Sequence, residues 1–291
     1  MRTTHSGARG GTPGRLRTMP DRIRRYGARA WRAQWPVYCE IVLFVVLDLA
    51  YEVLRALVAP DPAGVRGAFR HAHSILRTEH AIGVAIESWA QRVTDAVAGG
   101  RFVTTWYYTL AYTPLFIVFF VGLWYLRKSN YAFVRNWFWT AHGLALIVFW
   151  AYPVAPPRLV ARGLIDTTKQ ALTLGGALDW FQHLRNEYAA MPSLHIGQSF
   201  LFALTLYWLC RSWGPWRNVW WVLPAWMAWV TFATANHYVF DGLGGLIAVA
   251  AALAIVNWIS AGDIPRPWQR DQTADATSTL GTELRQPGGR A

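Results

Sequence analysis

Six long apolar runs separated by polar segments dominate the pattern of the chain. They lie near residues 37–58, 102–126, 131–152, 195–210, 218–236 and 239–259. A helix needs about 20 mostly apolar residues to cross a hydrocarbon core of about 30 Å. The pattern therefore predicts an all-α fold, a polytopic membrane protein built as a bundle of six transmembrane helices.

The segments outside these runs predict the domain organisation. Residues 1–34 and 261–291 mix Gly, Thr, Gln, Pro and charged residues without apolar periodicity, which predicts two disordered tails, the first of them basic. Residues 35–260 are expected to form the membrane domain. No cleavable signal peptide is expected, because the first apolar run starts near residue 37 and is too long for a signal core.

The distribution of positive charge predicts the orientation. Nine arginines precede the first apolar run, and a six-span topology places 18 Lys and Arg on the side of the termini. The two large loops on the other side, 59–101 and 153–194, carry nine. Because cytoplasmic segments carry an excess of Lys and Arg, both termini are expected in the cytoplasm and both large loops outside.

Composition argues against the main soluble alternatives. With 54% hydrophobic residues, 18 Trp and 15% charged residues, the chain does not have the makeup of a soluble domain. A net charge of +12 would suit nucleic acid if it covered a folded surface. Its concentration before the first apolar run is instead typical of a cytoplasmic flank, so the expected partner is the bilayer and no nucleic acid.

Polar and amphipathic features modify this simple pattern. In the first outer loop, residues 82–93 place apolar side chains at helical spacing, which predicts an amphipathic interfacial helix. In the first run, Asp48, Glu52 and Arg55 share one helical face. They form either an inward-facing stripe that pairs within itself or with a neighbouring helix, with Arg55 snorkelling outward, or a face toward a substrate. A lone His142 in the third run is expected to be hydrogen-bonded structure.

Three blocks that can carry chemistry fall at the outer ends of the predicted spans, at residues 153–158, 191–195 and 236–241. In the third block, His237 and Asp241 are four residues apart and share one face of a helix that starts there. Asp241 can accept the Nδ1 proton of His237, which leaves Nε2 as a nucleophile. A metal site is the less favoured alternative, because neither a third clustered carboxylate nor a His-x-x-x-His spacing accompanies the pair.

The other two blocks supply a candidate acid and a candidate phosphate site. Pro192 and Ser193 suit the start of a helix, whose N-terminus can cradle phosphate. His195 would stand on the first turn of that helix, where an imidazole can protonate a departing oxygen. Residues 153–158 form a stiff turn ending in Arg158, whose planar guanidinium can bind phosphate oxygens. Taken singly, the block at 191–195 also suits a simple helix cap with a His at the level of the lipid headgroups. The block at 153–158 also suits an Arg that contacts a lipid headgroup.

Together these blocks resemble a known family. They read Tyr-Pro-Val-Ala-Pro-Pro-Arg at 152–158, a segment 186–195 that ends in Met-Pro-Ser-Leu-His, and Asn-His-Tyr-Val-Phe-Asp at 236–241. The combination resembles the type-2 phosphatidic acid phosphatase superfamily, most closely its inositol phosphorylceramide synthase-like branch. The resemblance covers roughly residues 35–260 and implies a six-helix core that needs no metal or other cofactor.

The resemblance also implies roles for individual residues. His237 would form a phosphohistidine intermediate, Asp241 would support it, His195 would protonate the leaving group, and Arg158 and Ser193 would bind phosphate. Asn236 and Tyr188 are possible supporting residues.

Two departures from the superfamily pattern bear on phosphate binding. Ala151 stands seven residues before Arg158, where the superfamily has a Lys, and Thr231 stands six before the candidate nucleophile, where it has an Arg. The second phosphate-binding arginine is therefore missing. Candidate replacements from the same outer loop are Arg162, Lys169 and Arg185.

The sequence thus predicts an integral-membrane enzyme that acts on a lipid phosphate through a histidine nucleophile. It is either a lipid phosphate phosphatase or a phosphotransferase with a polyol or inositol acceptor, with its active site on the extracytoplasmic face. Two alternatives stay open: a polyprenyl pyrophosphate phosphatase, and a non-catalytic membrane protein or transporter with the same fold.

Overall fold

The computed structural model describes residues 36–167, 186–260 and 264–269, and most of the two predicted tails, 1–34 and 261–291, lies outside these ranges. The described chain is helical, with one isolated parallel bridge between Val154 and Ala189 and no strand. The helices are α2 (Val37–Leu57), α3 (Pro62–Ala81), α4 (Glu87–Asp95), α5 (Gly100–Trp106), the π-helix η1 (Tyr107–Ala111), α6 (Tyr112–Leu126), α7 (Lys128–Ala151), α8 (Pro157–Val160), α11 (Leu194–Leu209), the 3₁₀ segment η3 (Arg211–Trp221), α12 (Val222–Ala233) and α13 (Val239–Ser260).

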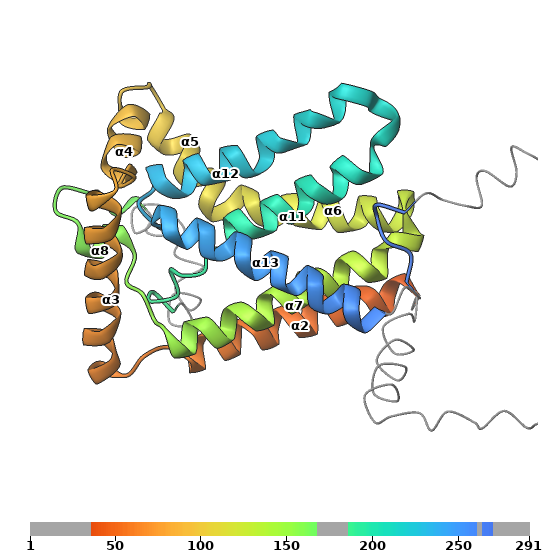
Figure 1. The fold of residues 1–291 in the computed structure, drawn as a ribbon, viewed down its shortest axis with the longest axis horizontal. Coiled ribbons are helices and arrows are strands. Elements are labelled where there is room, and N and C mark those ends of the chain that lie inside the picture. Colours follow the sequence, from red (N-terminus) through yellow and green to blue (C-terminus); the bar gives the residue numbers. More distant parts are fainter. Residues whose placement is uncertain (1–35, 168–185, 261–263, 270–291) are drawn as a thin grey trace, which may run out of the picture.

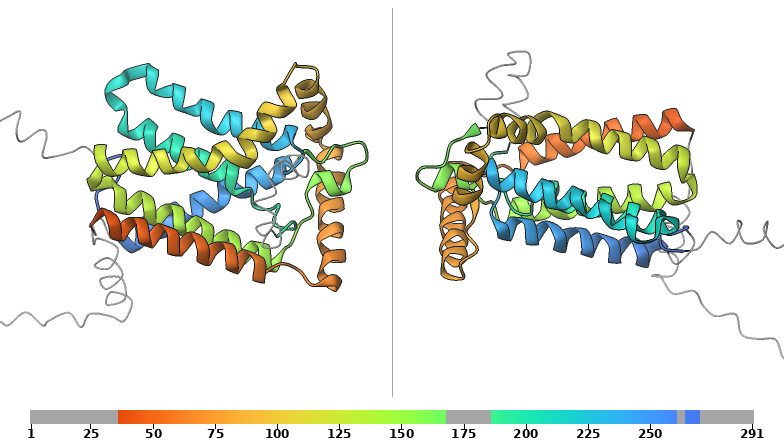
Figure 2. Two further views of the ribbon diagram at one scale, coloured as in Figure 1. Left: turned by 180° about the vertical axis from the view of Figure 1, so that it is seen from behind. Right: turned by 90° about the horizontal axis from the view of Figure 1, so that it is seen from above.

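The long helices form a bundle that is closed at one end by a crossing helix. Helices α2, α6, α7, α11, α12 and α13 run along a common direction, and α3 lies across one end of them together with α4 and α8 (Figures 1 and 2). Helix α13 packs against α7 and α11, and α11 packs in turn against α12. The largest apolar core lies between α6, α7, α11 and α13, and Trp137 and Leu201 are fully buried in it.

Every predicted apolar run contains a helix, which confirms the all-α class. The second run is broken, because its two halves, Gly100–Leu110 and Tyr112–Leu126, meet at 52°. By length and composition, α13 is the one helix among the described residues that can cross a bilayer alone, and the bent pair is a second if it is counted as one span. Helix α2 carries four charged residues. The six-span count therefore stays a prediction.

Helix α3 was not predicted, although its sequence contains the signals for it. Asp61 caps its N-terminus, since its carboxylate accepts a hydrogen bond of 2.6 Å from the backbone N–H of Gly64, and a proline follows at the first helical position. Its buried side chains include Ala68, Ala72 and Ile75, at spacings of four and three. The stripe is narrow and made of small residues, so it gives a weak apolar signal.

The predicted amphipathic helix is present as α4, and it buries its polar side. Trp89 and Val93 are 52% and 38% exposed, whereas Glu87 and Gln91 are buried. The amide of Gln91 donates to the carbonyl oxygens of residues 165 and 233 and accepts from the N–H of residue 165. Helix α4 therefore attaches to the bundle through polar contacts, together with the buried Ala90 and the contact of Trp89 with Trp229.

The polar positions of the predicted spans pair as expected, with one exception. Glu52 and Arg55 form an ion pair of 2.5 Å. His142 accepts from Gln198 at 2.7 Å and donates to a backbone carbonyl at 2.8 Å, which confirms it as hydrogen-bonded structure. Asp48 is exposed rather than inward-facing, on a helix that lies at the edge of the bundle (Figure 1).

Close contact between α11 and α13 depends on two glycines. A Cβ on Gly197 would lie 2.7 Å from the carbonyl oxygen of Gly245, and a Cβ on Gly245 would overlap the carbonyl oxygen of Ser193. Small residues of this kind let two helix backbones approach closely in a membrane. The contact fixes the position of the start of α11 relative to the start of α13.

We expect Gly245→Ala to destabilise the protein by about 1–3 kcal/mol, because the added methyl group forces the two backbones apart. Gly244→Ala is the matched control, since its Cβ would lie 3.3 Å from the flexible end of Met191. Melting followed by tryptophan fluorescence in detergent measures both. Equal melting temperatures for the two variants would contradict a backbone contact at Gly245.

Candidate active site

A polar pocket lies at the end of the bundle that α3 crosses. Its lining comes from α2, η1, α7, α8, α11 and the two segments that precede α11 and α13, and its volume is about 80 Å³. The charged, imidazole and amide side chains that line it are Arg55, Arg158, Asn186, Glu187, His195, Asn236 and His237. Segments far apart in the sequence therefore meet here, as the common placement of the three blocks at helix ends predicted.

His237 lies just before α13, in the segment that enters this helix. The chain turns out of α12 through Ala235, whose φ of 53° lies in the left-handed region that non-glycine residues seldom adopt. His237 is 5% exposed, and its Nδ1 lies 2.8 Å from the carbonyl oxygen of Ala190. A carbonyl can only accept, so Nδ1 carries the proton and Nε2 holds the lone pair of the neutral ring. Nε2 has no hydrogen-bond partner among the described residues.

Asp241 lies on the first turn of α13, behind His237 rather than in the pocket. Its Oδ2 is 3.5 Å from Nδ1 of His237 and accepts the backbone N–H of Tyr238 at 2.9 Å. The nearest acceptor for the His237 proton is thus the Ala190 carbonyl and not Asp241. The Ala190 carbonyl reaches His237 because the bridge between Val154 and Ala189 holds the segment before α11 against the chain after α7. Asp241 instead adds a buried carboxylate beside the imidazole.

His195 stands on the first turn of α11, as predicted, because the helix begins at Leu194. Its ring stacks on Tyr108 at a centroid distance of 4.5 Å and lies 5.1 Å from the ring of Tyr112. The centroids of the His195 and His237 rings are 5.8 Å apart. Both imidazoles can therefore reach a single group bound between them.

Arg158 is the second residue of the short helix α8 and is held by its neighbours. Its guanidinium donates to Oδ1 of Asn236 at 2.6 Å and forms ion pairs with Asp166 at 3.3 Å and Glu187 at 4.0 Å. Its backbone N–H donates to the carbonyl of Ala235, which ties α8 to the turn before His237. Asn236 thus supports Arg158, and two carboxylates already offset the charge of this arginine.

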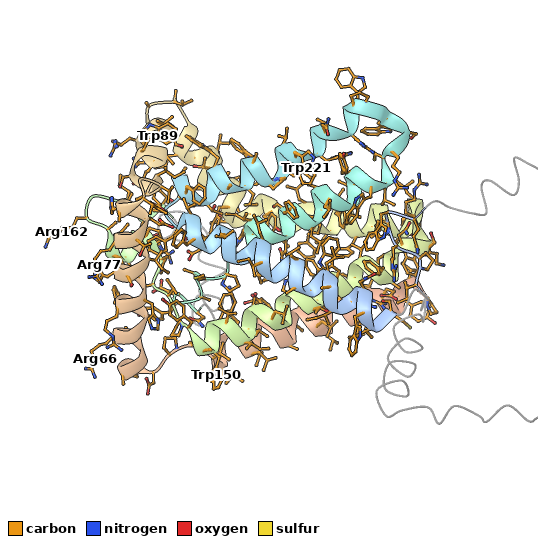
Figure 3. The ribbon with its side chains drawn as sticks, in the orientation of Figure 1. Arg66, Arg77, Trp89, Trp150, Arg162 and Trp221 are labelled. Atoms are coloured by element: carbon orange, nitrogen blue, oxygen red, sulfur yellow. The ribbon has the colours of Figure 1, made fainter. Side chains whose placement is uncertain are left out.

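The remaining predicted residues lie elsewhere. Ser193 is fully buried before α11, and its hydroxyl has no partner among the described residues and does not line the pocket. Tyr188 packs its ring against Phe69. Arg162 is exposed and points away from the bundle (Figure 3). Lys169 and Arg185 lie outside the described residues.

Arg55 is the pocket residue whose place the sequence did not settle. It lies near the end of α2 and lines the pocket together with Arg158, His195 and His237. Its backbone carbonyl accepts a hydrogen bond of 3.1 Å from Asn186, which fixes the end of α2 against the segment before α11. Among the described residues that line the pocket, Arg55 and Arg158 are the two arginines. The charge pattern of the first apolar run singled out Arg55, but it left open whether the side chain faces a neighbouring helix or a substrate.

Two buried glutamates, one on α3 and one on α4, lie behind the pocket beside the start of α13. Glu79 accepts the backbone N–H of Phe240 at 2.7 Å, and Glu87 lies close by. Burial is the largest cause that raises the pKa of Glu79 to about 8; the bond from Phe240 lowers it, and the charge of Glu87 raises it further. Burial likewise raises the pKa of Glu87. These carboxyls, together with Asp241, accept the free N–H groups of the α13 N-terminus.

This raised pKa predicts how stability depends on pH. The unfolded chain releases the Glu79 proton above its ordinary pKa of 4.5, whereas the folded protein keeps it up to about 8. Stability should therefore fall as pH rises between these values. We expect Glu79→Gln to flatten this fall in melting temperature, and Glu187→Gln, whose side chain is 43% exposed, to leave it unchanged. An unchanged slope in Glu79→Gln would contradict a protonated Glu79.

Comparison with known families gives the class of the protein. An all-helical chain whose pocket combines two imidazoles with two arginines has the residues to bind and attack a phosphate. The model of the PAP2 superfamily matches residues 73–255, and the chain belongs to this superfamily. Membership indicates phosphatase or phosphotransferase activity on phosphate esters and association with a membrane. No curated protein and no solved structure matches the chain.

The matched range contains all three predicted blocks. Helix α2, which carries Arg55, lies outside it. The arginine of α2 is therefore a feature of this chain that the family match does not cover.

Proposed function

We propose that the protein is an integral-membrane enzyme that transfers a phosphoryl group, or a phosphorylated headgroup, from a lipid phosphate ester through His237. The observation that carries this proposal is the meeting of His195, His237 and Arg158 in one pocket, with Nε2 of His237 unpaired among the described residues. In the neutral ring this buried nitrogen carries the lone pair, which places it to act as a nucleophile.

The proposed reaction has two steps. In the first, the Nε2 lone pair of His237 attacks phosphorus, the bond from phosphorus to the ester oxygen breaks, and His195 gives that oxygen its proton. In the second, water or an alcohol attacks the phosphohistidine, His195 takes the proton of the attacking oxygen, and the bond from phosphorus to nitrogen breaks. His237 and His195 then return to their starting states, and no metal ion takes part in either step.

Phosphate binding in this scheme falls to two arginines. Arg158 is already paired with Asp166 and Glu187, so it alone leaves the charge of a phosphate poorly balanced. Arg55, which pairs with Glu52, supplies a second guanidinium to the pocket from the end of α2. Fixed donors aimed at the equatorial oxygens stabilise the charge of the transition state. Arg55 thus takes the place of the arginine that Thr231 replaces, and Arg162 does not.

The proposed setting is a bilayer crossed by six spans, with both termini in the cytoplasm and the polar pocket on the extracytoplasmic side. Exposed apolar side chains along four of the long helices support it: Val42, Val45, Leu49, Leu115, Val118, Ile147, Trp150, Leu243 and Ile247. Apolar surface of this extent marks a membrane or protein contact. The excess of Lys and Arg in the tails and short loops on the side of the termini supports the orientation.

The same intermediate serves hydrolysis and transfer, so the acceptor decides between a phosphatase and a phosphotransferase. The resemblance of the three blocks to the inositol phosphorylceramide synthase-like branch favours transfer to inositol or another polyol. A polyprenyl pyrophosphate phosphatase uses the same residues on a different substrate. A non-catalytic membrane protein or transporter with this fold is the rival from another class, and the intact imidazole pair speaks against it.

The test is product analysis with the purified full chain in detergent. Labelled lipid phosphates, including a polyprenyl pyrophosphate, are supplied with and without inositol, and vanadate is added as a mimic of the five-coordinate phosphoryl group. We expect turnover that vanadate inhibits and EDTA does not. A protein that binds no vanadate and releases no product from any of these substrates is the non-catalytic rival.

A further inference from the structure

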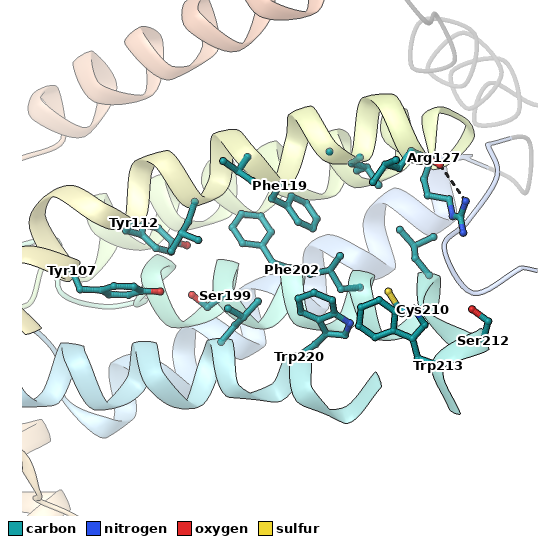
Figure 4. A pocket seen from close by; sticks show the side chains of 18 residues that line it. Tyr107, Tyr112, Phe119, Arg127, Ser199, Phe202, Cys210, Ser212, Trp213 and Trp220 are labelled. Carbon is teal, nitrogen blue, oxygen red and sulfur yellow. Dashed lines mark hydrogen bonds between the residues drawn. The ribbon is translucent and has the colours of Figure 1, made fainter. Parts of the chain in front are cut away.

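An apolar groove runs along the bundle from the active-site end toward the opposite end. Its volume is about 520 Å³, and its walls come from α6, α11, η3 and α12. Tyr107, Tyr112 and Ser199 stand at one end of it, Phe119 and Phe202 along it, and Arg127 and Ser212 at the far end (Figure 4). The volume is typical of a pocket that holds a small molecule.

The groove begins beside His195. The hydroxyl of Tyr112 donates to Gln198 at 2.7 Å, and its ring lies 5.1 Å from that of His195. Ser199 follows His195 by four residues on α11, and so lies on the same helix face one turn further along. Tyr107 and Tyr112 line the end of the groove, whereas Tyr108 and His195 line the polar pocket, so the two cavities lie on opposite sides of one cluster of rings.

The proposed chemistry fixes the position of the leaving alcohol beside His195. In the proposed reaction His195 protonates the oxygen of the leaving alcohol, so that oxygen sits at His195. The carbon chain attached to the oxygen must continue away from the phosphate, past the same imidazole. The groove is the apolar cavity beside this imidazole, and it begins on the other side of the Tyr112 ring.

The length of the groove limits the kind of chain. It follows α6 from Tyr112 to Leu126, a helix of 15 residues and about 22 Å. One leaflet accounts for only about 15 Å of a hydrocarbon core of about 30 Å. A chain that fills the groove from the site end must therefore pass the middle of the bilayer.

We infer that the groove binds the hydrocarbon chain of the leaving alcohol, and that the enzyme prefers phosphate esters of a single chain long enough to pass the bilayer midplane. The inference rests on the proposed function for the position of the leaving oxygen. It assigns the specificity for chain length to α6 and α11, and the phosphate chemistry to the polar pocket. Two-chain lipids with tails of one leaflet use only the first part of the groove.

Gly122 allows a clean test. It lines the groove, and a Cβ added there would meet no atom within 4 Å. It lies ten residues beyond Tyr112, or about 15 Å along the helix. A phenylalanine at this position fills the deep half of the groove and leaves the site end open. Gly143, on α7, is the matched control, because its added Cβ also meets nothing and it does not line the groove.

The experiment compares single-chain alkyl phosphates of short and long chain length on the wild type, Gly122→Phe and Gly143→Phe. We expect Gly122→Phe to lower kcat/KM for the long chain by roughly tenfold or more. Its kcat/KM for the short chain, and all values for Gly143→Phe, should stay within about twofold of the wild type. Equal effects on both chain lengths, or no effect on either, would overturn the inference while leaving the proposed function intact.

A second readout does not depend on turnover. A long-chain alcohol with a photoreactive group near its end is crosslinked to the wild type, to Gly122→Phe and to His237→Ala. We expect labelled peptides from the second halves of α6 and α11 in the wild type and His237→Ala, and loss of this label in Gly122→Phe. Label spread evenly over the outward faces of all helices would mean that the groove holds only bulk lipid, and would overturn the inference. An inactive wild type that still labels the groove would contradict the proposed function alone.

Discussion

Replacing His237 with alanine is expected to lower the turnover of lipid phosphate by on the order of 10⁴-fold or more, because it removes the imidazole on which the covalent intermediate forms. The expression level and the melting temperature should change little, since among the described residues the imidazole makes one short hydrogen bond, to Ala190, and a longer contact of 3.5 Å to Asp241. The measurement is phosphate or product release by the purified variant in detergent, beside its thermal melt.

His73→Ala is the control for this variant. His73 is an exposed histidine on α3, at the same end of the bundle, and does not line the pocket. It should keep wild-type activity. If His237→Ala retains near-normal phosphatase and transferase activity, His237 is not the nucleophile.

Replacing Arg55 with glutamine is expected to lower kcat/KM for lipid phosphate by about 10²–10³-fold, the effect of removing one fixed donor from a developing negative charge. Arg55→Lys should fall between the wild type and Arg55→Gln, because an ammonium keeps the charge but lacks the planar fork. Vanadate inhibition should weaken in parallel, since vanadate occupies the same oxygen positions.

Two controls separate binding from structure. Glu52→Gln breaks the same ion pair but leaves the guanidinium in place, so it should retain activity. Arg77→Gln removes an arginine at the same end of the bundle that is exposed and points outward, and should change nothing (Figure 3). If Glu52→Gln loses as much activity as Arg55→Gln, the ion pair rather than phosphate binding explains the loss.

The sequence predicted the parts of the site that depend on local pattern. Pro192 and Ser193 predicted the start of α11, and the helix begins at Leu194. Apolar runs of membrane length predicted the long helices, and blocks placed at their ends predicted that His195, His237 and Arg158 would meet. Helix length and end position are local properties, which explains why these predictions were possible from one sequence.

The parts that depend on packing were not predictable in the same way. The acceptor for His237 is the carbonyl of Ala190, a backbone atom whose place depends on the contact between Val154 and Ala189. Every residue has a backbone carbonyl, so the sequence alone does not single out that of Ala190. Side-chain chemistry pointed to Asp241 as the acceptor of the His237 proton. The direction in which the Arg55 side chain points depends on which helices face α2. Its spacing from Glu52 was compatible both with a stripe that pairs within the bundle and with a face toward a substrate.

The bend between α5 and α6 was not predicted, although the sequence contains a signal for it. Pro114 lacks a backbone N–H, and its ring clashes with the carbonyl four residues earlier. That carbonyl lies in the π-helical turn where the two halves meet at 52°. The bend places Tyr108 and Tyr112 beside His195. A single straight span would not bring both rings to the same imidazole.

The central claim is that Nε2 of His237 forms a bond to phosphorus, and trapping that bond is its most direct measurement. The purified protein is mixed with a lipid phosphate labelled at phosphorus, quenched in base within the first turnovers, and digested for mass spectrometry. We expect a phosphorylated peptide that contains His237, with label that is stable in base and lost in acid, and no label in His237→Ala. Turnover without label on His237, or label on another residue of the wild type, would contradict the claim.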